Sequence, residues 1–199
     1  MKKEIVNSIK NTLTIESNSI DRLKYSLDME KIVELVEVIA NSRGKIILAG
    51  CGTSGMAAKK IAHTLSCIEI PSLFLSPADS IHGGLGVLKK DDILILISKG
   101  GKTMEIINYI PICKIKKAFL VGVTENDNSL LAKESDLFLK IYVEREPCPF
   151  GLLATASTIA VIAVFDAITI ALMQRTKYTK EQFRIIHPGG AVGEKLATK

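Results

Sequence analysis

The chain of 199 residues is long enough to bury a hydrophobic core and short enough to form one domain. Hydrophobic residues make up 47% and charged residues 24%, which excludes a disordered or fibrous protein. The formal net charge is +5, but the lysines are spread along the chain, and no helix-turn-helix, zinc-finger or RNA-recognition signature accompanies them. We therefore expect no nucleic-acid partner, although a positive potential attracts anionic metabolites.

The sequence also predicts no membrane span and no export signal. The longest apolar run, 159–165, stops at Asp166 and is far shorter than the roughly 18 residues of a span. The basic first residues lack the apolar region of an export signal. The four cysteines are Cys51, Cys67, Cys113 and Cys148. Their wide spacing suits reduced thiols, so we expect a cytoplasmic protein with no membrane partner.

Two amphipathic helices are predicted first. Apolar residues recur at helical spacing over 3–13, at Ile5, Ile9 and Leu13, and again over 20–39. Gly44 ends this region. We expect residues 1–42 to form a helical extension in front of the rest of the chain.

Five β-like runs follow, at 45–50, 72–76, 92–98, 117–123 and 137–143; the last alternates more and is predicted at a sheet edge. Helical candidates separate them at 55–67, 103–110 and 129–134. Almost uniformly apolar strands separated by helices indicate a parallel sheet covered on both faces. The segment 155–174 is apolar nearly all round, which predicts a helix buried in the core or at a subunit interface.

The predicted fold class is therefore α/β, in three layers, with a five-stranded parallel sheet between helices. We expect one domain over 1–199, with its core over 45–195. In such sheets ligands bind beyond the carboxyl ends of the strands.

Two glycine-rich loops with hydroxyl side chains follow predicted strands. The sequence GCGTSG follows 45–49, and SKGGKT follows 92–97. The first matches the dinucleotide pattern G-x-G-x-x-G, but the next strand ends without the acidic residue that would hold a ribose. A phosphomonoester is the better fit for two such loops. The plainer alternative is that Ser54 and Thr103 only cap helices.

These two loops resemble those of the sugar isomerase (SIS) domain family. Residues 80–86, SIHGGLG, look like the HGDLG loop of the KpsF/GutQ group of arabinose-5-phosphate isomerases. Residues 146–152, EPCPFGL, with TAST at 155–158, are similar to its E-x-C-P-L-G-L…T-S-T segment. Residues 187–193, HPGGAVG, are close to its H-P-G-G-A-L-G signature. The resemblance covers about 45–195 and fits the short form without CBS domains.

The resemblance implies an enzyme that interconverts D-arabinose 5-phosphate and D-ribulose 5-phosphate. It also implies a homotetramer with active sites between subunits. Aldose–ketose isomerisation needs a base, a group that stabilises the enediolate oxygen and a grip on the phosphate. It needs no redox cofactor, and no metal is expected because no cluster of His, Cys and Asp has ligand spacing.

Twelve residues are the predicted site. Phosphate and substrate binding are assigned to Gly52, Thr53, Ser54, Ser98, Lys99, Gly100, Gly101 and Thr103. Four positions match functional residues of the family: His82, Glu105, Glu146 and His187. We expect Glu105 or His187 to be the base, with His82 and Glu146 handling hydroxyl protons and ring opening.

Each of these four residues also has a plainer explanation. The two histidines could be ordinary loop residues, Glu105 an exposed residue of a first helical turn, and Glu146 the partner of Arg145 in a surface ion pair. The third histidine, His63, is predicted to be structural.

Two departures from the family leave the sugar open. Relatives usually carry a lysine where this chain has Thr53, and S-N-S-G-E-[ST] where it has SKGGKT. Lys99 either supplies the missing charge or points into solvent. Alternatives are another SIS isomerase, for example of a hexulose 6-phosphate, and a sugar-phosphate sensor without catalysis. A redox role for Cys51, at a helix N-terminus where the pKa of a thiol falls, is a further alternative.

Overall fold

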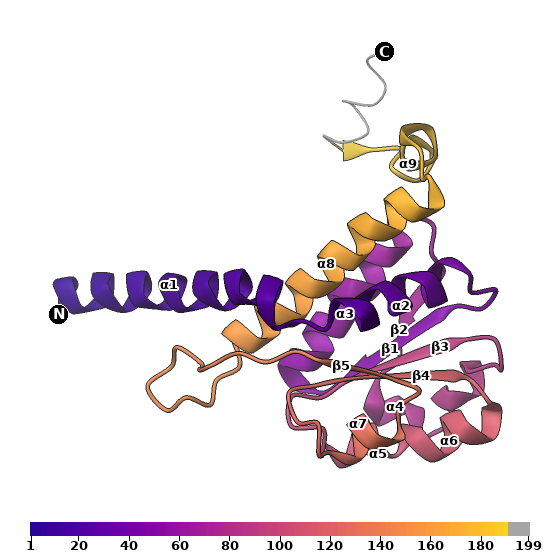
Figure 1. Ribbon diagram of the computed structural model, residues 1–199, viewed down its shortest axis with the longest axis horizontal. Helices are drawn as coiled ribbons and strands as arrows, with labels where there is room; N and C mark the ends of the chain where they lie inside the picture. The colour runs from indigo at the N-terminus through magenta and orange to yellow at the C-terminus, as the bar shows by residue number, and fades with distance from the viewer. Residues whose placement is uncertain (191–199) are drawn as a thin grey trace.

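The computed structural model describes residues 1–190 and is built around one parallel sheet (Figure 1). The strand order is β2-β1-β3-β4-β5, and every neighbouring pair is parallel. The strands are β1 (Ile46–Gly50), β2 (Ser72–Phe74), β3 (Ile93–Ile97), β4 (Phe119–Thr124) and β5 (Leu137–Lys140). All five predicted strands and the three-layer α/β class are therefore confirmed, and the alternating run does lie at an edge.

Side chains alternate between two hydrophobic clusters, one on each face of the sheet. Ile46, Leu48 and Ile95 belong to the cluster between the sheet and α2, α3 and α8. Ile47 and Leu94 belong to the cluster between the sheet and α5, α6 and α7, on the opposite face (Figure 1). Strands buried on both faces explain why their sequences are apolar without alternation. The helices of the upper layer in Figure 1 are α1 (Lys2–Ser26), α2 (Met29–Ala40), α3 (Gly52–Ser66) and α8 (Ala156–Thr176).

The remaining helical elements are short, and α5, α6 and α7 among them cover the face of the sheet opposite α8. They are α4 (Pro77–Ser80), a 3₁₀ turn η1 (Gly84–Val87), α5 (Met104–Ile107), α6 (Tyr109–Lys116), α7 (Leu130–Glu134) and α9 (Lys180–Ile186). The sequence did not predict α4, η1 or α9. The predicted helix over 103–110 ends too early, because α5 is followed directly by α6, which runs to Lys116.

The N-terminal helix α1 is longer than predicted and only partly packed. The predicted boundaries of 3–13 and 20–39 are wrong, because α1 runs unbroken to Ser26 and the chain breaks at Leu27 and Asp28 before α2 begins. Ile15, Ser19 and Leu23 are its buried residues, and this half lies on α8. The first half extends away from the body of the molecule (Figure 1), so Ile9 and Leu13 are exposed by 56% and 60%.

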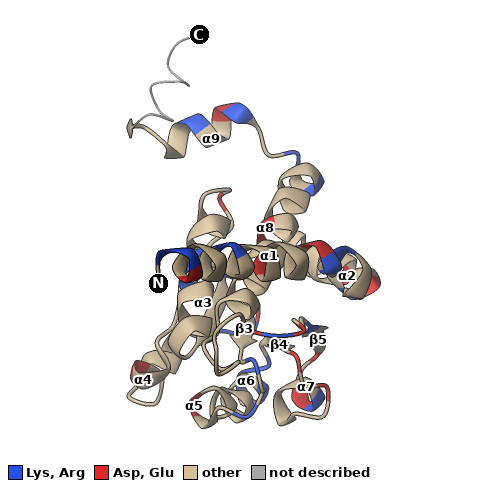
Figure 2. Ribbon diagram, turned by 90° about the vertical axis from the view of Figure 1, so that its left-hand side faces the viewer, with Lys and Arg blue, Asp and Glu red and all other residues tan. Residues whose placement is uncertain are grey.

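The apolar helix α8 packs only one face against the rest of the chain. Its buried residues are Ala156, Ala160, Val164, Phe165, Ile168, Thr169 and Leu172. Among the described helices, α8 alone is long and apolar enough to cross a membrane by length and composition. However, Asp166 near its middle forms an ion pair with Lys60 of α3. Figure 2 shows few charged residues along α8, in contrast to α1, α2 and α9.

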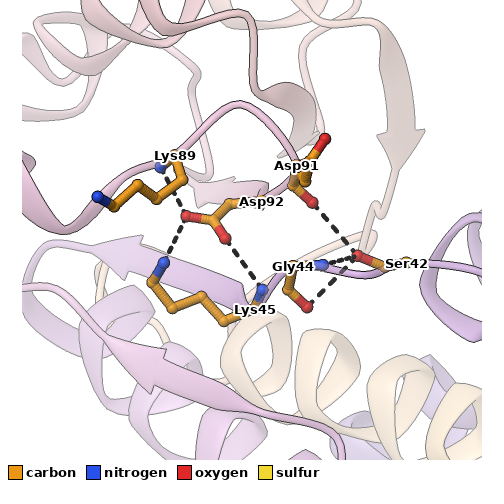
Figure 3. A network of polar contacts seen from close by, with 6 residues as sticks. All are labelled: Ser42, Gly44, Lys45, Lys89, Asp91 and Asp92. Atoms are coloured by element: carbon orange, nitrogen blue, oxygen red, sulfur yellow. Dashed lines mark hydrogen bonds and ion pairs between the residues drawn. The ribbon is translucent and has the colours of Figure 1, made fainter.

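At the amino-terminal edge of the sheet, a buried carboxylate ties two strands together (Figure 3). Asp92 accepts hydrogen bonds from the backbone and ammonium nitrogens of Lys45, at 3.0 and 2.6 Å, and from the amide of Lys89 at 2.7 Å. Burial by itself raises the pKa of Asp92, but these bonds outweigh it and lower the pKa. The starts of β1 and β3 are thus joined at the end of the sheet opposite the glycine-rich loops.

Candidate active site

The two glycine-rich loops meet at the switch point of the sheet. Since β2 lies on one side of β1 and β3 on the other, the connections that leave β1 and β3 diverge there. Ligands bind at this point in open α/β sheets. The loop after β1 opens α3, and the loop after β3 leads to α5. The prediction that both loops lie at strand carboxyl ends is confirmed.

The first loop is a tight corner between β1 and α3. A Cβ atom at Gly55 would lie 2.6 Å from the carbonyl oxygen of Gly50, so the helix backbone approaches the strand too closely for any side chain. Cys51 is the N-cap of α3, with Gly52, Thr53 and Ser54 in the first turn. The suggestion that Ser54 caps the helix is therefore wrong. Thr53 and Ser54 are instead placed at the positive end of a 15-residue helix.

The second loop is a compact turn held by its own hydroxyls. Ser98 Oγ and Thr103 Oγ1 are 3.0 Å apart, and the amide of Gly101 donates to the Ser98 carbonyl oxygen. Thr103 is the N-cap of α5, but its side chain makes no capping bond within the described residues. Gly101 has a φ of +64°, and a Cβ there would lie 2.3 Å from Ser129 Oγ. Glycine is therefore required at this position.

Lys99 and Glu146 form an ion pair beside this turn. Lys99 Nζ lies 2.7 Å from Glu146 Oε1, and the Glu146 side chain is fully buried while that of Lys99 is 37% exposed. Glu146 Oε2 accepts the amides of Thr155 at 3.0 Å and Ser157 at 3.4 Å. Burial by itself raises the pKa of Glu146, but the bonds from Lys99, Ser157 and Thr155 outweigh it and lower the pKa. Glu146 therefore pairs with Lys99, and the alternative of a surface ion pair with Arg145 is wrong.

A cavity of about 90 Å³ lies between α3, the loops after β3 and β4, and the start of α8. Its polar lining comes from Thr53, Ser54, Lys99, Thr124, Glu125, Ser157 and Thr158. This space is large enough for several water molecules. Three of the predicted substrate-binding residues thus face one space, with the predicted Glu146 directly behind Lys99.

Glu125 in this lining was missed by the sequence analysis. It follows β4 directly, and its amide donates to the Lys99 carbonyl oxygen at 3.0 Å. Thr124 Oγ1 donates to the same oxygen at 2.7 Å. A signal was available, because residues just beyond the carboxyl end of a central strand are where ligand-binding groups lie.

Glu105 and His82 do not line this cavity. Glu105 lines a separate cavity of about 630 Å³ together with Cys51, Gly52, Lys59 and Asp79. It is exposed in the first turn of α5, as its plainer explanation predicted. His82 is exposed just after α4, and its amide donates to the Asp79 carbonyl oxygen.

Cys51 does not fit the redox alternative. Burial and the charge of Glu105 raise its pKa, so the expectation of a lowered value is wrong.

His187 is not brought to the carboxyl ends of the strands within one chain. It follows α9, where its ring stacks on Phe183 with centroids 3.9 Å apart and its Nδ1 lies 2.9 Å from the Phe183 carbonyl oxygen. The 21-residue helix α8 starts beside Glu146 and is about 30 Å long. The helix α9 lies beyond its far end (Figure 1). The rest of the HPGGAVG motif, 191–193, lies outside the described residues, as does the predicted end of the core at 195.

The SIS domain model matches residues 38–171, which include both loops, Glu125 and Glu146. The chain belongs to the SIS domain family. This SIS chain is 36% identical over 195 residues to the arabinose 5-phosphate isomerase KpsF of Escherichia coli O6:H1. That alignment covers 98% of this chain and 60% of the relative, so the chain spans about 60% of the length of the curated relatives it matches.

Two solved structures are similar to this SIS chain along nearly its whole length. A sugar-phosphate isomerase, described as putative, from Listeria monocytogenes shares 56% identity and a TM-score of 0.94, covering 95% of this chain and 99% of that one. An Escherichia coli CFT073 protein in complex with arabinose 5-phosphate shares 32% identity and a TM-score of 0.90, covering 94% and 100%. The predicted resemblance to the KpsF/GutQ group is confirmed.

Proposed function

We propose that this SIS chain is an aldose–ketose isomerase that interconverts D-arabinose 5-phosphate and D-ribulose 5-phosphate through an enediol intermediate. One observation carries the proposal: the hydroxyls of Thr53 and Ser54 share a cavity with the ammonium group of Lys99, which is held by the buried Glu146. The names of the relatives, and the sugar phosphate bound in the Escherichia coli CFT073 structure, support the choice of sugar.

The phosphate group is assigned to the corner between the two loops. Ser98 and Thr103 offer hydroxyl donors, the turn offers the amide of Gly100, and the N-terminus of α3 adds a positive field. Lys99, held by Glu146 beside this turn, can supply part of the positive charge missing at Thr53 to the enediolate. Binding the phosphate fixes the open-chain sugar, so that binding energy far from the reacting carbons assists the reaction.

Proton transfer is assigned to Glu105 or His187, with His82 at a hydroxyl. A carboxylate or an imidazole can move the proton between C2 and C1, and a hydrogen-bond donor at the sugar oxygen stabilises the enediolate. Glu105 borders the larger cavity next to the first loop, which favours it as the residue that one chain supplies on its own. No cofactor or metal is assigned to the reaction.

A homotetramer with active sites between subunits is part of the proposal. His187 lies about one length of α8 from Glu146, so a neighbouring subunit must supply it if it acts at this site. Ile5, Ile9 and Leu13 form an exposed apolar stripe on the projecting half of α1. The β5–α8 connection projects on the same side and exposes Phe150 and Leu152 (Figure 1). Patches of this kind mark surfaces for association.

We further propose a single domain and a cytoplasmic location. The helices α2 and α8 share one hydrophobic cluster with the sheet, which supports one domain. All four cysteines are free thiols, which suits a reducing compartment.

The direct test is incubation with D-arabinose 5-phosphate in deuterated water. We expect ribulose 5-phosphate that carries solvent deuterium at C1, detected by NMR. The Glu105→Gln variant should lose at least tenfold in kcat, while Glu30→Gln, which removes an exposed carboxylate on α2, should match the wild type. No turnover of this sugar, but turnover of a hexulose 6-phosphate, would change the substrate. Tight binding without turnover of any sugar phosphate would make the protein a sensor.

A further inference from the structure

Glu146 has little capacity left for a substrate. Its Oε1 accepts from Lys99, and its Oε2 accepts two backbone amides, from Thr155 and Ser157. A carboxylate offers about four acceptor positions, so three of them are occupied. The side chain is also completely buried. A sugar hydroxyl therefore has no access to Glu146 unless the ion pair and the start of α8 come apart.

Glu125 is the carboxyl group that faces the cavity beside Lys99. Its side chain forms no hydrogen bond or ion pair with the residues that the structure describes. Its backbone is firmly placed, because the Glu125 amide and the Thr124 hydroxyl both donate to the Lys99 carbonyl oxygen. The chain thus aims an available carboxyl group at the same small space as the ammonium group of Lys99.

The charges around this cavity favour hydroxyl groups over phosphate. Burial raises the pKa of Glu125, Lys99 lowers it, Glu146 raises it further, and the net direction is upward. When ionised, the two carboxylates together carry one more charge than Lys99 balances. That full charge outweighs the partial positive charge of the α3 N-terminus, about half an elementary charge, at Thr53 and Ser54, so the cavity disfavours a phosphate dianion. A sugar hydroxyl can donate a hydrogen bond to the Glu125 carboxylate without that penalty.

We propose that Glu125 is a substrate-contacting residue that accepts a hydrogen bond from a hydroxyl of the open-chain sugar, and that Glu146 is a positioning residue that acts through Lys99. This inference rests on the proposed sugar-phosphate function. It assigns the phosphate to the hydroxyl-rich turn of Ser98 and Thr103 and the sugar hydroxyls to the cavity at Glu125.

The test compares a sugar phosphate with inorganic phosphate. The dissociation constants of D-arabinose 5-phosphate and inorganic phosphate are measured by calorimetry for the wild type, Glu125→Gln and Glu125→Ala. We expect both variants to bind the sugar phosphate about 10- to 100-fold more weakly, as for loss of one charge-assisted hydrogen bond. Inorganic phosphate should bind equally or more tightly. Equal changes for both ligands, or no change, would overturn the role of Glu125.

The matched control is Asp127→Asn, two residues further along the same loop. Asp127 is exposed and forms an ion pair with Lys140 at 2.8 Å, so removing its charge should leave both dissociation constants unchanged. Thermal unfolding of each variant shows whether it is folded. Turnover separates the two proposals. A wild type that prefers the sugar phosphate through Glu125 but does not isomerise it refutes the isomerase alone. An active wild type with equal kcat/KM in Glu125→Gln refutes the role of Glu125 alone.

The positioning role of Glu146 is tested by a double-mutant cycle with Lys99→Met. If Glu146 acts through Lys99, adding Glu146→Gln to Lys99→Met should cause little further loss of sugar-phosphate binding, and Glu146→Asp should recover part of the loss of Glu146→Gln. Losses that simply add in the double variant would contradict this role.

Discussion

Lys99 Nζ lies 2.7 Å from Glu146 Oε1, although 47 residues separate the two in the sequence. This contact joins the loop after β3 to the start of α8, because Glu146 also receives the amides of Thr155 and Ser157. The ion pair therefore orders one wall of the candidate site before any ligand arrives.

Replacing Lys99 with Met should affect both stability and activity. The buried Glu146 would lose its charged partner, and we expect the free energy of unfolding to fall by about 1–2 kcal/mol. This lies between the values for exposed and for fully buried ion pairs, because Lys99 is 37% exposed. We expect kcat/KM to fall at least tenfold. Urea unfolding and steady-state kinetics measure the two effects. Lys102→Met, which removes an exposed cation of the same loop, is the control and should change neither. Unchanged kinetics in Lys99→Met would mean that its charge serves only the fold.

Replacing Asp92 with Asn should lower stability in a pH-dependent way. The pKa of Asp92 is held below its ordinary value, so its ionised form stabilises the fold above about pH 4, and this contribution disappears as the pH falls through the lowered pKa. We expect a loss of about 1–3 kcal/mol at pH 6. Urea titrations at pH 6 and pH 3 should show the wild type and the variant converging in acid. A difference that stays constant over this range would contradict the pKa argument.

Gly101→Ala should damage the turn that contains Ser98 and Thr103. The added methyl group would lie 2.3 Å from Ser129 Oγ, and the residue would keep a φ of +64°. We expect a loss of about 1–3 kcal/mol in unfolding free energy and weaker binding of inorganic phosphate. Gly86→Ala is the control, since a Cβ atom at Gly86 would have no other atom within 4 Å and the φ of Gly86 is negative. Equal stability of the two variants would show that the turn adapts.

Mixing subunits tests whether sites form between chains. We expect His187→Ala and Lys99→Met each to be nearly inactive alone. After joint refolding, mixed oligomers should regain activity, because some sites then combine an intact His187 from one chain with an intact Lys99 from another. Enzyme assays of the mixture and mass photometry check this. A mixture that stays as inactive as its components, despite forming mixed oligomers, would contradict the shared site.

The sheet was predictable because its physical cause is local. Five short apolar runs such as 93–97 have almost no alternative to strands buried on both faces. Apolar spacing predicted helices over 3–13 and 20–39, but α1 runs unbroken from Lys2 to Ser26 because Ile15 and Ser19 pack on α8. That packing is a tertiary effect, which no local pattern reports.

The site was only partly predictable for a related reason. Thr53, Ser54 and Lys99 follow strand ends, so the rule of parallel sheets was enough to group them. The partner of Glu146 could not be read from its neighbours, since Arg145 is adjacent in sequence and Lys99 is distant. The separation of His187 from the two loops could not be predicted either, because it depends on the length and direction of α8.

The close approach of Gly55 to Gly50 explains why GCGTSG looks like a nucleotide signature. Both positions require glycine because the start of α3 packs closely against the end of β1, and this requirement does not depend on which ligand binds. Proteins that share this six-residue motif have a tight strand-to-helix turn in common, and not necessarily a ligand. A search for dinucleotide-binding proteins that relies on the glycine spacing alone will therefore also find sugar-phosphate-binding proteins. The hydroxyl residues between the glycines say more about the ligand than the glycines do.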